Sequence, residues 1–573
     1  MTGVSSSTNP VPNFYRASAE DFRKIPGSPI AYWVSERVRE IFNEGTNIGK
    51  VSRPRHGMST GNNNLYLRRW NEVNIGDTGF NIDSRQNSKE SGKKWFPVTK
   101  GGEFKKWYGN NDYVINYWRN GHDMIQANID GLNPGFRHDN TGFYFKPGIT
   151  WSTISSSSLS MRYIDVGFII ESKGSACYCN DYNTLIEMLG YANSKLVNHF
   201  LLTLSPTLDY HEGPLGRVPV ILQTNYRIIE IIHKCLLSAR IDWNSYETSW
   251  DFTTLLLLRP DYRGRNLKET YTTLRSHWQE TTLEMQQLEE ENNRIFIEAY
   301  GLEDELTPDV PLSEITLTCN PYYRHKGDKT EKELEELLQR DTIKELISYS
   351  VGCMFGRYSL DKPGLILANQ GDKLKDFLEQ VPEPSFMPDD DNIIPILDDE
   401  YFTDDIVSRF KDFLKITFGR ETLSQNLDFI AKVLSGKSTG SPEKIIRDYF
   451  IRDFYKDHVQ TYKKRPIYWM FSSGKNQGFN ALIYMHRYDR STLAKMRTDY
   501  LLELESKLDA EIGMISGDDA KNKTKITKVR NQIEEIQKYD ELLNNKALSM
   551  IEIDLDDGVV VNYAKFEGLV KEI

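Results

Sequence analysis

Short aromatic and β-branched runs alternate with turn residues through the first 220 residues of the chain. Clear examples are residues 143–145, 149–151 and 167–170, with Gly, Asn and Pro between them. Runs of this kind are typical of short strands. Residues 184–204 instead carry apolar positions at the helical period, which predicts a single amphipathic helix. The N-terminal part is therefore predicted to be strand-rich, within an α+β fold.

A longer helical pattern occupies the middle of the chain. Apolar residues recur every three to four positions over roughly four heptads, with polar residues interrupting at positions 281 and 292. The apolar positions are Leu267, Tyr271, Leu274, Trp278, Met285, Leu288 and Ile295. The pattern predicts a long helix. A helical spacer packed on a partner helix and an ordinary amphipathic helix on a core explain it equally well.

Two helical stripes near the C-terminus predict an antiparallel hairpin. They flank a break at residues 513–519 and consist of Leu501, Leu504, Leu508 and Ile512, then of Ile526, Val529, Ile533, Ile536 and Leu543. The tail at residues 551–563 alternates apolar and polar positions. It is therefore predicted to be a strand pair that turns at residues 556–558.

Charge is distributed unevenly along the chain. The net charge is −11, but the first 250 residues contain 27 Lys and Arg against 23 Asp and Glu, and the remaining residues contain 44 against 59. A local positive face governs contact with phosphates more than the whole-chain sum does. The overall acidity therefore does not exclude a nucleic-acid partner.

Cysteine usage and hydropathy indicate the compartment. The five cysteines are scattered, with no pair at metal-finger spacing, which is typical of reduced thiols in a cytoplasm. The first 15 residues lack the pattern of a signal peptide, and no apolar run approaches the ~20 residues of a membrane helix. We therefore expect a cytoplasmic protein without a membrane partner.

The segment between Glu44 and Glu72 contains no carboxylate, and its centre, residues 57–64, is rich in Gly and Asn. Arg contacts phosphates or guanine edges, Asn can pair with adenine through two hydrogen bonds, and glycine lets a loop approach closely. The candidate DNA contacts are Arg53, Arg55, Thr60, Asn62, Asn63, Arg68 and Arg69. By composition alone, a solvated turn with incidental charges explains the segment as well.

A second basic and aromatic stretch lies at residues 93–108. Its candidate DNA contacts are Lys105, Lys106 and Trp107, because interleaved lysines and aromatic rings can clamp and stack on a strand. The alternative is that these tryptophans belong to the core.

Residues 320–323 resemble the catalytic turn of amino-methyltransferases, Asn/Asp-Pro-Pro-aromatic. In that turn, oxygen atoms accept hydrogen bonds from the target amine while the ring stacks on the flipped base. Here Tyr322 replaces the second proline, and no Gly-rich turn for S-adenosylmethionine precedes the motif. The sequence therefore disfavours catalysis by this turn.

The acidic stretch at residues 389–405 supplies carboxylates of the kind that Mg²⁺ prefers. No lysine stands at the spacing of a nuclease site, so a charged loop between elements explains the stretch better. The histidines show no metal-ligand spacing either. No metal site is predicted.

Long strings across the chain resemble one family. They are residues 25–33, 95–97, 100–110, 193–195 with 204–207, 351–361, 465–470 and 484–488. These strings resemble the PglX-type adenine-specific DNA methyltransferases of bacteriophage-exclusion (BREX) systems, from about residue 22 to the C-terminus. They resemble type II methyltransferase-endonucleases more loosely.

The resemblance is to the C-terminal half of that family, which contains the target-recognition region. It implies that the S-adenosylmethionine domain precedes this region, so we expect no cofactor on this chain and no activity of the chain alone. The intact enzyme would methylate adenine N6 with S-adenosylmethionine. The implied partners are double-stranded DNA, a methyltransferase catalytic domain or chain, and other BREX proteins.

The patterns and the resemblance together predict five parts. They are a flexible leader (1–24), a DNA target-recognition domain (25–220), a helical spacer (221–310), a mixed α/β C-terminal domain (311–500), and a helical hairpin with a tail (501–573).

A specificity module that binds DNA without chemistry of its own is the leading hypothesis. The alternatives are an active methyltransferase that uses residues 320–323 and a scaffold that docks other defence proteins without binding DNA. Binding of S-adenosylmethionine separates the first two hypotheses, and binding of DNA separates the first from the third.

Overall fold

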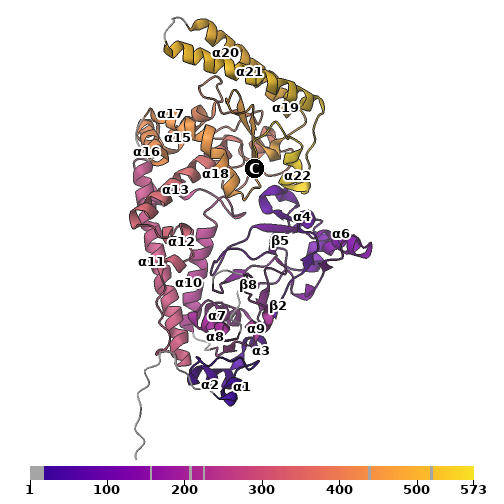
Figure 1. Ribbon diagram of the computed structural model, residues 1–573, viewed down its shortest axis with the longest axis vertical. Helices are drawn as coiled ribbons and strands as arrows, with labels where there is room; N and C mark the ends of the chain where they lie inside the picture. Colours follow the sequence, from indigo (N-terminus) through magenta and orange to yellow (C-terminus); the bar gives the residue numbers. More distant parts are fainter. Residues whose placement is uncertain (1–17, 155–157, 205–208, 223–225, 436–439, 516–519) are drawn as a thin grey trace, which may run out of the picture.

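The computed structural model describes residues 18–154, 158–204, 209–222, 226–435, 440–515 and 520–573. Small sheets occupy one side of the elongated molecule, and the helices α10 (Tyr226–Trp243) and α11 (Leu267–Tyr300) run along the other (Figure 1). Helices dominate the C-terminal region, which lies at the opposite end from α1. This arrangement confirms the predicted mixed α+β fold.

Two four-stranded sheets form what we call the sheet region, residues 46–220. The first has the order β10-β5-β6-β4 and the second the order β2-β11-β8-β9. Their strands are β2 (Arg53–Arg55), β4 (Leu67–Arg69), β5 (Trp95–Thr99), β6 (Tyr113–Asn116), β8 (Gly148–Trp151), β9 (Met161–Ile164), β10 (Ile169–Ile170) and β11 (Ala176–Tyr178). The pairs β1 (Thr46–Asn47) with β12 (Pro219–Val220) and β3 (Ser59–Thr60) with β7 (Phe136–Arg137) complete the region.

The aromatic runs serve the core of this region. Residues 149–151 and 169–170 are strands, as predicted, whereas residues 143–145 are not. Phe145 has a left-handed backbone (φ 67°) and a fully buried ring. A bulky residue in that conformation cannot continue a ladder, so burial of the ring overrides the strand propensity of this run.

Helical segments within the sheet region and just before it are mostly short. They are α2 (Glu36–Glu44), α3 (Ile48–Val51), α4 (Asn63–Tyr66), α5 (Arg85–Glu90), α6 (Trp118–Ile129), α7 (Tyr182–Ala192), α8 (Lys195–Leu204) and α9 (Glu212–Gly216). The single helix predicted over residues 184–204 is therefore wrong, because α7 and α8 are separate. The Asn193 side chain bonds both the N–H and the carbonyl of Met161, and such side-chain bonding competes with helix continuation.

Helix α11 confirms the predicted long helix. Asn266 caps its start by accepting from the Glu269 N–H, and left-handed Gly301 (φ 64°) ends it. Five of the seven predicted apolar positions, from Leu267 to Met285, are buried, and α11 packs on α10, α7 and α8. Asn292, one of the polar interruptions, is also buried and donates to the Gly190 carbonyl.

The C-terminal region is built around a three-stranded sheet of order β13-β15-β14, which consists of β13 (Ile394–Pro395), β14 (Tyr468–Ser472) and β15 (Asn480–Tyr484). The strands β14 and β15 are almost wholly buried. Helices surround them, namely α12 (Pro321–Arg324), α13 (Glu331–Met354), α14 (Leu374–Gln380), α15 (Ile406–Phe418), α16 (Leu423–Ser435), α17 (Pro442–Tyr449), α18 (Tyr455–Thr461) and α19 (Thr492–Lys495).

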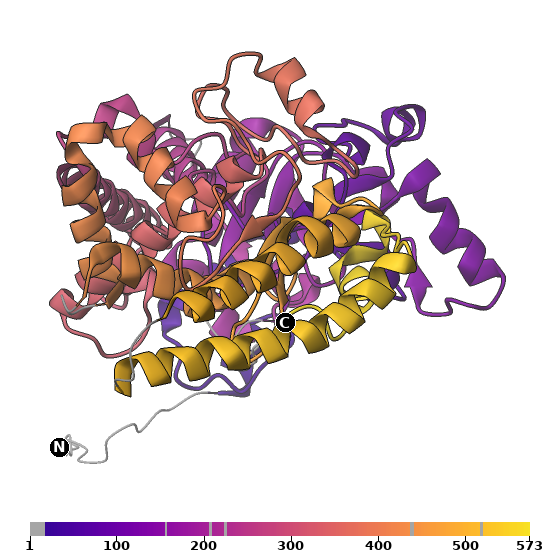
Figure 2. The same ribbon diagram turned by 90° about the horizontal axis from the view of Figure 1, so that it is seen from above.

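The predicted antiparallel hairpin is present as α20 (Leu502–Met514) and α21 (Ala520–Leu548), which lie side by side across the end of the molecule (Figure 2). Lys525 pairs with Glu511, and Gln537 donates to Glu505 at 2.8 Å. A higher residue number on α21 thus pairs with a lower residue number on α20, which shows that the two helices are antiparallel.

The tail departs from the prediction. Residues 555–557 form a short 3-10 turn and α22 (Gly558–Ala564) follows, so the predicted strand pair is wrong. Val559, Asn562 and Tyr563 are buried at helical spacing, which brief alternation in the sequence concealed.

The same tail closes against the sheet region. Asp556 accepts hydrogen bonds from the Trp95 indole at 2.7 Å and from Lys94 at 2.5 Å. Arg68 donates to the Asp556 carbonyl, and Glu72 accepts from the Val559 N–H at 2.9 Å. Residues near the C-terminus thus complete the edge of the sheet that carries β4.

The remaining predictions concern the leader, the thiols and the membrane. Residues 1–17 of the predicted leader lie outside the described residues, whereas residues 19–23 form the short helix α1 (Ala19–Arg23), capped by Ser18. Residues 205–207 of the family strings also lie outside. All five cysteines are free thiols. Within the described ranges, every helix is too short or too polar to cross a bilayer.

Candidate nucleic-acid interface

An exposed edge runs from β2 through residues 61–65. Strand β2 pairs only with β11 in its sheet, so it is an edge strand. Arg53 on this strand is exposed, and Arg55 is half-buried with its guanidinium 5.2 Å from the centre of the Phe143 ring. Edge strands often carry charged residues and proline, and here two arginines flank Pro54.

Hydrogen bonds from buried residues hold the asparagine-rich segment at residues 61–65 in place. Asn133 donates to the Thr60 carbonyl at 2.8 Å, and the Thr60 hydroxyl donates to the Asn63 side-chain oxygen at 2.5 Å. Gly61 has φ 72°, and a Cβ there would stand 1.9 Å from the Asn133 oxygen, so only glycine fits. Thr60 is buried, so the structure gives it a positioning role in place of the predicted DNA contact.

The loop presents its polar side chains to solvent. Asn62 and Asn63 are exposed, as a readout of base edges requires, and so are Asn64 and Leu65. Leu65 has 55% of its surface exposed. Its exposure could not be predicted, because nothing in the local sequence separates an exposed leucine from a core one. We call Arg53, Arg55, Asn62, Asn63, Asn64 and Leu65 the loop face.

Helix α6 projects beside α4 at the edge of the molecule (Figure 1). Arg119, Asn120 and Gly121 all have left-handed backbones, with φ of 46°, 61° and 83°. Arg119 is exposed and stacks on the Trp118 ring at 4.3 Å. The Asn-Gly pair is a turn signal, and it is the one feature of the sequence that marked this projection.

Arg68 and Arg69 differ in their surroundings. Arg68 is buried and donates to the carbonyls of Asn64 and Leu67 in addition to Asp556. Its burial corrects the prediction that it contacts DNA. Arg69 is half-buried, 3.6 Å from the Asp112 carboxylate, and donates to the Tyr113 hydroxyl at 3.3 Å.

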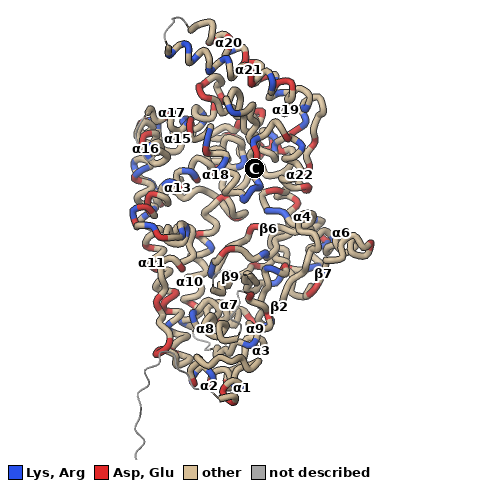
Figure 3. The backbone as a smooth tube through the Cα atoms, in the orientation of Figure 1, with Lys and Arg blue, Asp and Glu red and all other residues tan. Residues whose placement is uncertain are grey.

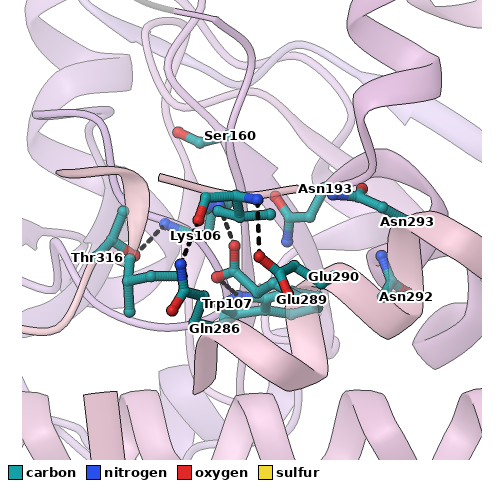
Figure 4. Close-up of polar contacts among 12 residues, drawn as sticks. Lys106, Trp107, Ser160, Asn193, Gln286, Glu289, Glu290, Asn292, Asn293 and Thr316 are labelled. Carbon is teal, nitrogen blue, oxygen red and sulfur yellow. Dashed lines mark hydrogen bonds and ion pairs between the residues drawn. The ribbon is translucent and has the colours of Figure 1, made fainter. Parts of the chain in front are cut away.

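Lys105, Lys106 and Trp107 are interior residues, so the structure corrects the prediction that they clamp a strand. Figure 4 shows Lys106 and Trp107 directed at Glu289 of α11. Glu289 forms a buried ion pair with Lys106 and accepts from the Trp107 indole at 2.7 Å. The tryptophans therefore belong to the core, as the alternative interpretation held.

Lys105 extends this network. Its ammonium donates to the Thr316 carbonyl at 3.0 Å and lies 3.9 Å from the Asp242 carboxylate. Burial lowers the pKa of Lys105 and raises that of Glu289, while the opposite charges beside them, Asp242 and Lys106, oppose these shifts. The stretch therefore ties the sheet region to α10 and α11.

The Asn320 side chain is hydrogen-bonded to the backbone around it. It is fully buried, its amide donates to the Leu312 and Ile315 carbonyls at 2.7 and 2.8 Å, and its oxygen caps α12 at the Tyr322 N–H. Tyr322 and Tyr323 line an open hollow that Asn320 does not reach. The side chain is therefore not free to bind a target amine, which counts against the catalytic alternative.

The acidic stretch is likewise structural. Asp405 caps α15 and holds Arg447 through two hydrogen bonds of 2.7 and 2.9 Å. Burial, with Asp391 next to it, raises the pKa of Asp389 to about 8. In the described part of the chain, no group of three or more His, Cys, Asp or Glu residues is arranged to hold a metal ion.

The fold and the loop face define a mixed α+β protein with exposed arginine and asparagine on a segment, residues 45–71, that contains no Asp or Glu. No family model matches the chain. In an alignment 587 positions long that covers 99% of the chain, it is 41% identical to the adenine-specific methyltransferase PglX of Lacticaseibacillus casei (strain Zhang). In an alignment 579 positions long that covers 98% of the chain, it is 37% identical to the adenine-specific methyltransferase BrxX of Escherichia coli O9:H4 (strain HS).

The likeness to PglX that the sequence strings indicated thus extends along nearly the whole chain. The chain spans about half the length of these curated relatives, 47% and 46% respectively.

Proposed function

We propose that this chain recognises duplex DNA for an adenine-specific methyltransferase of a BREX phage-defence system and corresponds to the C-terminal half of that enzyme. The observation that carries the proposal is the loop face, where two arginines and three asparagines stand on a segment, residues 45–71, whose sequence contains no Asp or Glu. The similarity to PglX and BrxX supplies the reaction class.

The proposed contacts follow from side-chain chemistry. Arg53 and Arg55 bind phosphates or guanine edges, and Asn62 and Asn63 read adenine through paired hydrogen bonds. Gly61 brings the loop close to the duplex. Leu65 provides an apolar contact of the kind that a thymine methyl group accepts.

The methyl transfer itself is proposed to take place in another part of the enzyme. S-adenosylmethionine would bind a catalytic domain or chain that joins this one, and other BREX proteins are further proposed partners. The protein is proposed to act in the cytoplasm.

Salt dependence tests the DNA-binding proposal. Since each phosphate contact releases counterions, about four contacts would cost roughly a hundredfold in affinity between about 50 and about 200 mM salt. Fluorescence anisotropy with a labelled duplex measures this. A protein that binds no duplex even at the lowest salt would contradict the proposal and favour a scaffold.

Calorimetry with S-adenosylmethionine tests the proposal that the cofactor binds another part of the enzyme. We expect no heat of binding from this chain alone, because no Gly-rich turn for S-adenosylmethionine precedes residues 320–323 and the proposed cofactor domain lies elsewhere. Stoichiometric, tight binding would instead support catalysis by this chain. A methyltransferase of known cofactor affinity serves as the positive control.

A further inference from the structure

Two consecutive lysines follow the end of α18 and have an unusual backbone conformation. Lys463 and Lys464 have left-handed backbones, with φ of 50° and 61°. Both side chains are exposed, and within the described ranges neither makes an ion pair. Glycine and asparagine adopt the left-handed backbone conformation most readily, whereas it costs a lysine conformational energy.

The turn is fixed by its surroundings. The N–H groups of Lys463 and Lys464 bond to the Gln460 and Val459 carbonyls at the end of α18, at 3.0 and 2.8 Å. Beyond the turn, the buried His458 ring accepts from the Ile467 and Tyr468 N–H groups. Burial lowers the pKa of His458 to about 3, so its ring is a neutral acceptor. The lysines therefore stand on a rigid support.

This turn adjoins the sheet region. Arg465, the next residue, lies 3.8 Å from Glu72, whose carboxylate also accepts from the Arg69 N–H. Burial raises the pKa of the Asp112 carboxylate, and the positive charges of Arg69 and Lys463 oppose that shift. Basic positions lie on both sides of the boundary between α18 and α4 (Figure 3). We call Arg69, Lys463, Lys464 and Arg465 the junction patch.

One member of the junction patch, Arg69, is linked to the loop face along the chain. Strand β4 ends at Arg69, and its three residues span roughly 10 Å, which is well within one turn of a DNA duplex, about 34 Å. Since glycine or asparagine would form the same turn with less strain, what the lysines add at these two positions is positive charge.

We propose that Lys463 and Lys464 form a second phosphate-contacting site, which extends the DNA-binding surface from the sheet region onto the C-terminal region. This inference rests on the proposed function. It assigns to the C-terminal region a part in DNA binding that the loop face alone does not require.

The turn geometry allows a test that separates charge from folding. The variant K463G/K464G removes both charges and suits the left-handed backbone, so its melting temperature should equal or exceed that of the wild type. In anisotropy titrations with duplex DNA, the slope of log affinity against log salt should become shallower by about 1.8, because two phosphate contacts are lost. The variant K463N/K464N should behave alike.

A matched control removes two lysines from elsewhere. Lys332 in α13 and Lys375 in α14 are exposed and belong to neither the loop face nor the junction patch, so K332Q/K375Q should keep the wild-type slope. A wild-type slope in both junction variants, with wild-type DNA binding intact, would overturn this inference alone. Absence of duplex binding by the wild type would overturn the proposed function as well.

Discussion

Replacing Arg53, Arg55, Asn62 and Asn63 together by alanine is expected to weaken binding to duplex DNA about a thousandfold. Each bidentate contact between asparagine and a base contributes roughly 1–3 kcal/mol, and the two arginines supply charge-assisted bonds to phosphates. A summed loss of about 4 kcal/mol corresponds to that factor. Anisotropy at constant low salt measures it.

Stability should change little in this variant. All four side chains are exposed or half-buried, and substitutions at such positions usually alter the free energy of unfolding by less than about 0.5 kcal/mol each. The variant R265A/R294A, with one exposed arginine just before α11 and one within it, is the matched control for lost positive charge. Affinity within threefold of the wild type, with an unchanged melting temperature, would rule out the loop face as the main contact.

Replacing Glu289 by alanine should destabilise the protein by about 3–5 kcal/mol. The substitution strands the Lys106 ammonium in the interior without its carboxylate and leaves the Trp107 indole N–H without its acceptor. Removing one member of a buried ion pair costs that much because the remaining charge stays desolvated. Urea unfolding followed by tryptophan fluorescence measures the loss, and Trp107 itself reports on the network.

Two further variants distinguish charge from packing. Glu284 lies exposed on the same helix, so E284A should unfold like the wild type. In K106M/E289M both charges are replaced by apolar side chains, which should restore most of the lost stability. If E289A unfolds at the same urea concentration as E284A, the buried pair does not hold the sheet region to α11.

The long helices could be predicted because their signal is local and repeated. In α11 and in the hairpin of α20 and α21, apolar residues recur over many turns, so one odd residue does not hide the period. The prediction for the tail failed because its helical signal is short and not repeated. Over the seven residues of α22, alternation and helical spacing coincide too closely, and burial of Tyr563 decides between them.

The candidate site was only partly accessible to sequence reasoning. Exposure of Asn62 and Asn63 agrees with the loop-like composition around them. The burial of Lys106 did not follow from its neighbours, because the partner Glu289 is 183 residues away in the sequence. Arg68 and Lys94 look like surface cations for the same reason, since Asp556 comes from the far end of the chain.

The contact of Asp556 and α22 with the sheet region also bears on synthesis and on evolution. Domains emerge from the ribosome N-terminal end first, yet Arg68 on β4 and Trp95 on β5 gain Asp556 as a hydrogen-bond partner, and Glu72 gains Val559, only when residues 556–559 have been made. Recombination that exchanged the N-terminal 220 residues alone would leave a foreign tail against that edge. Under the proposed function, new DNA specificities should therefore arise by exchange of residues 61–65 within a retained frame, or by exchange of both ends of the chain together.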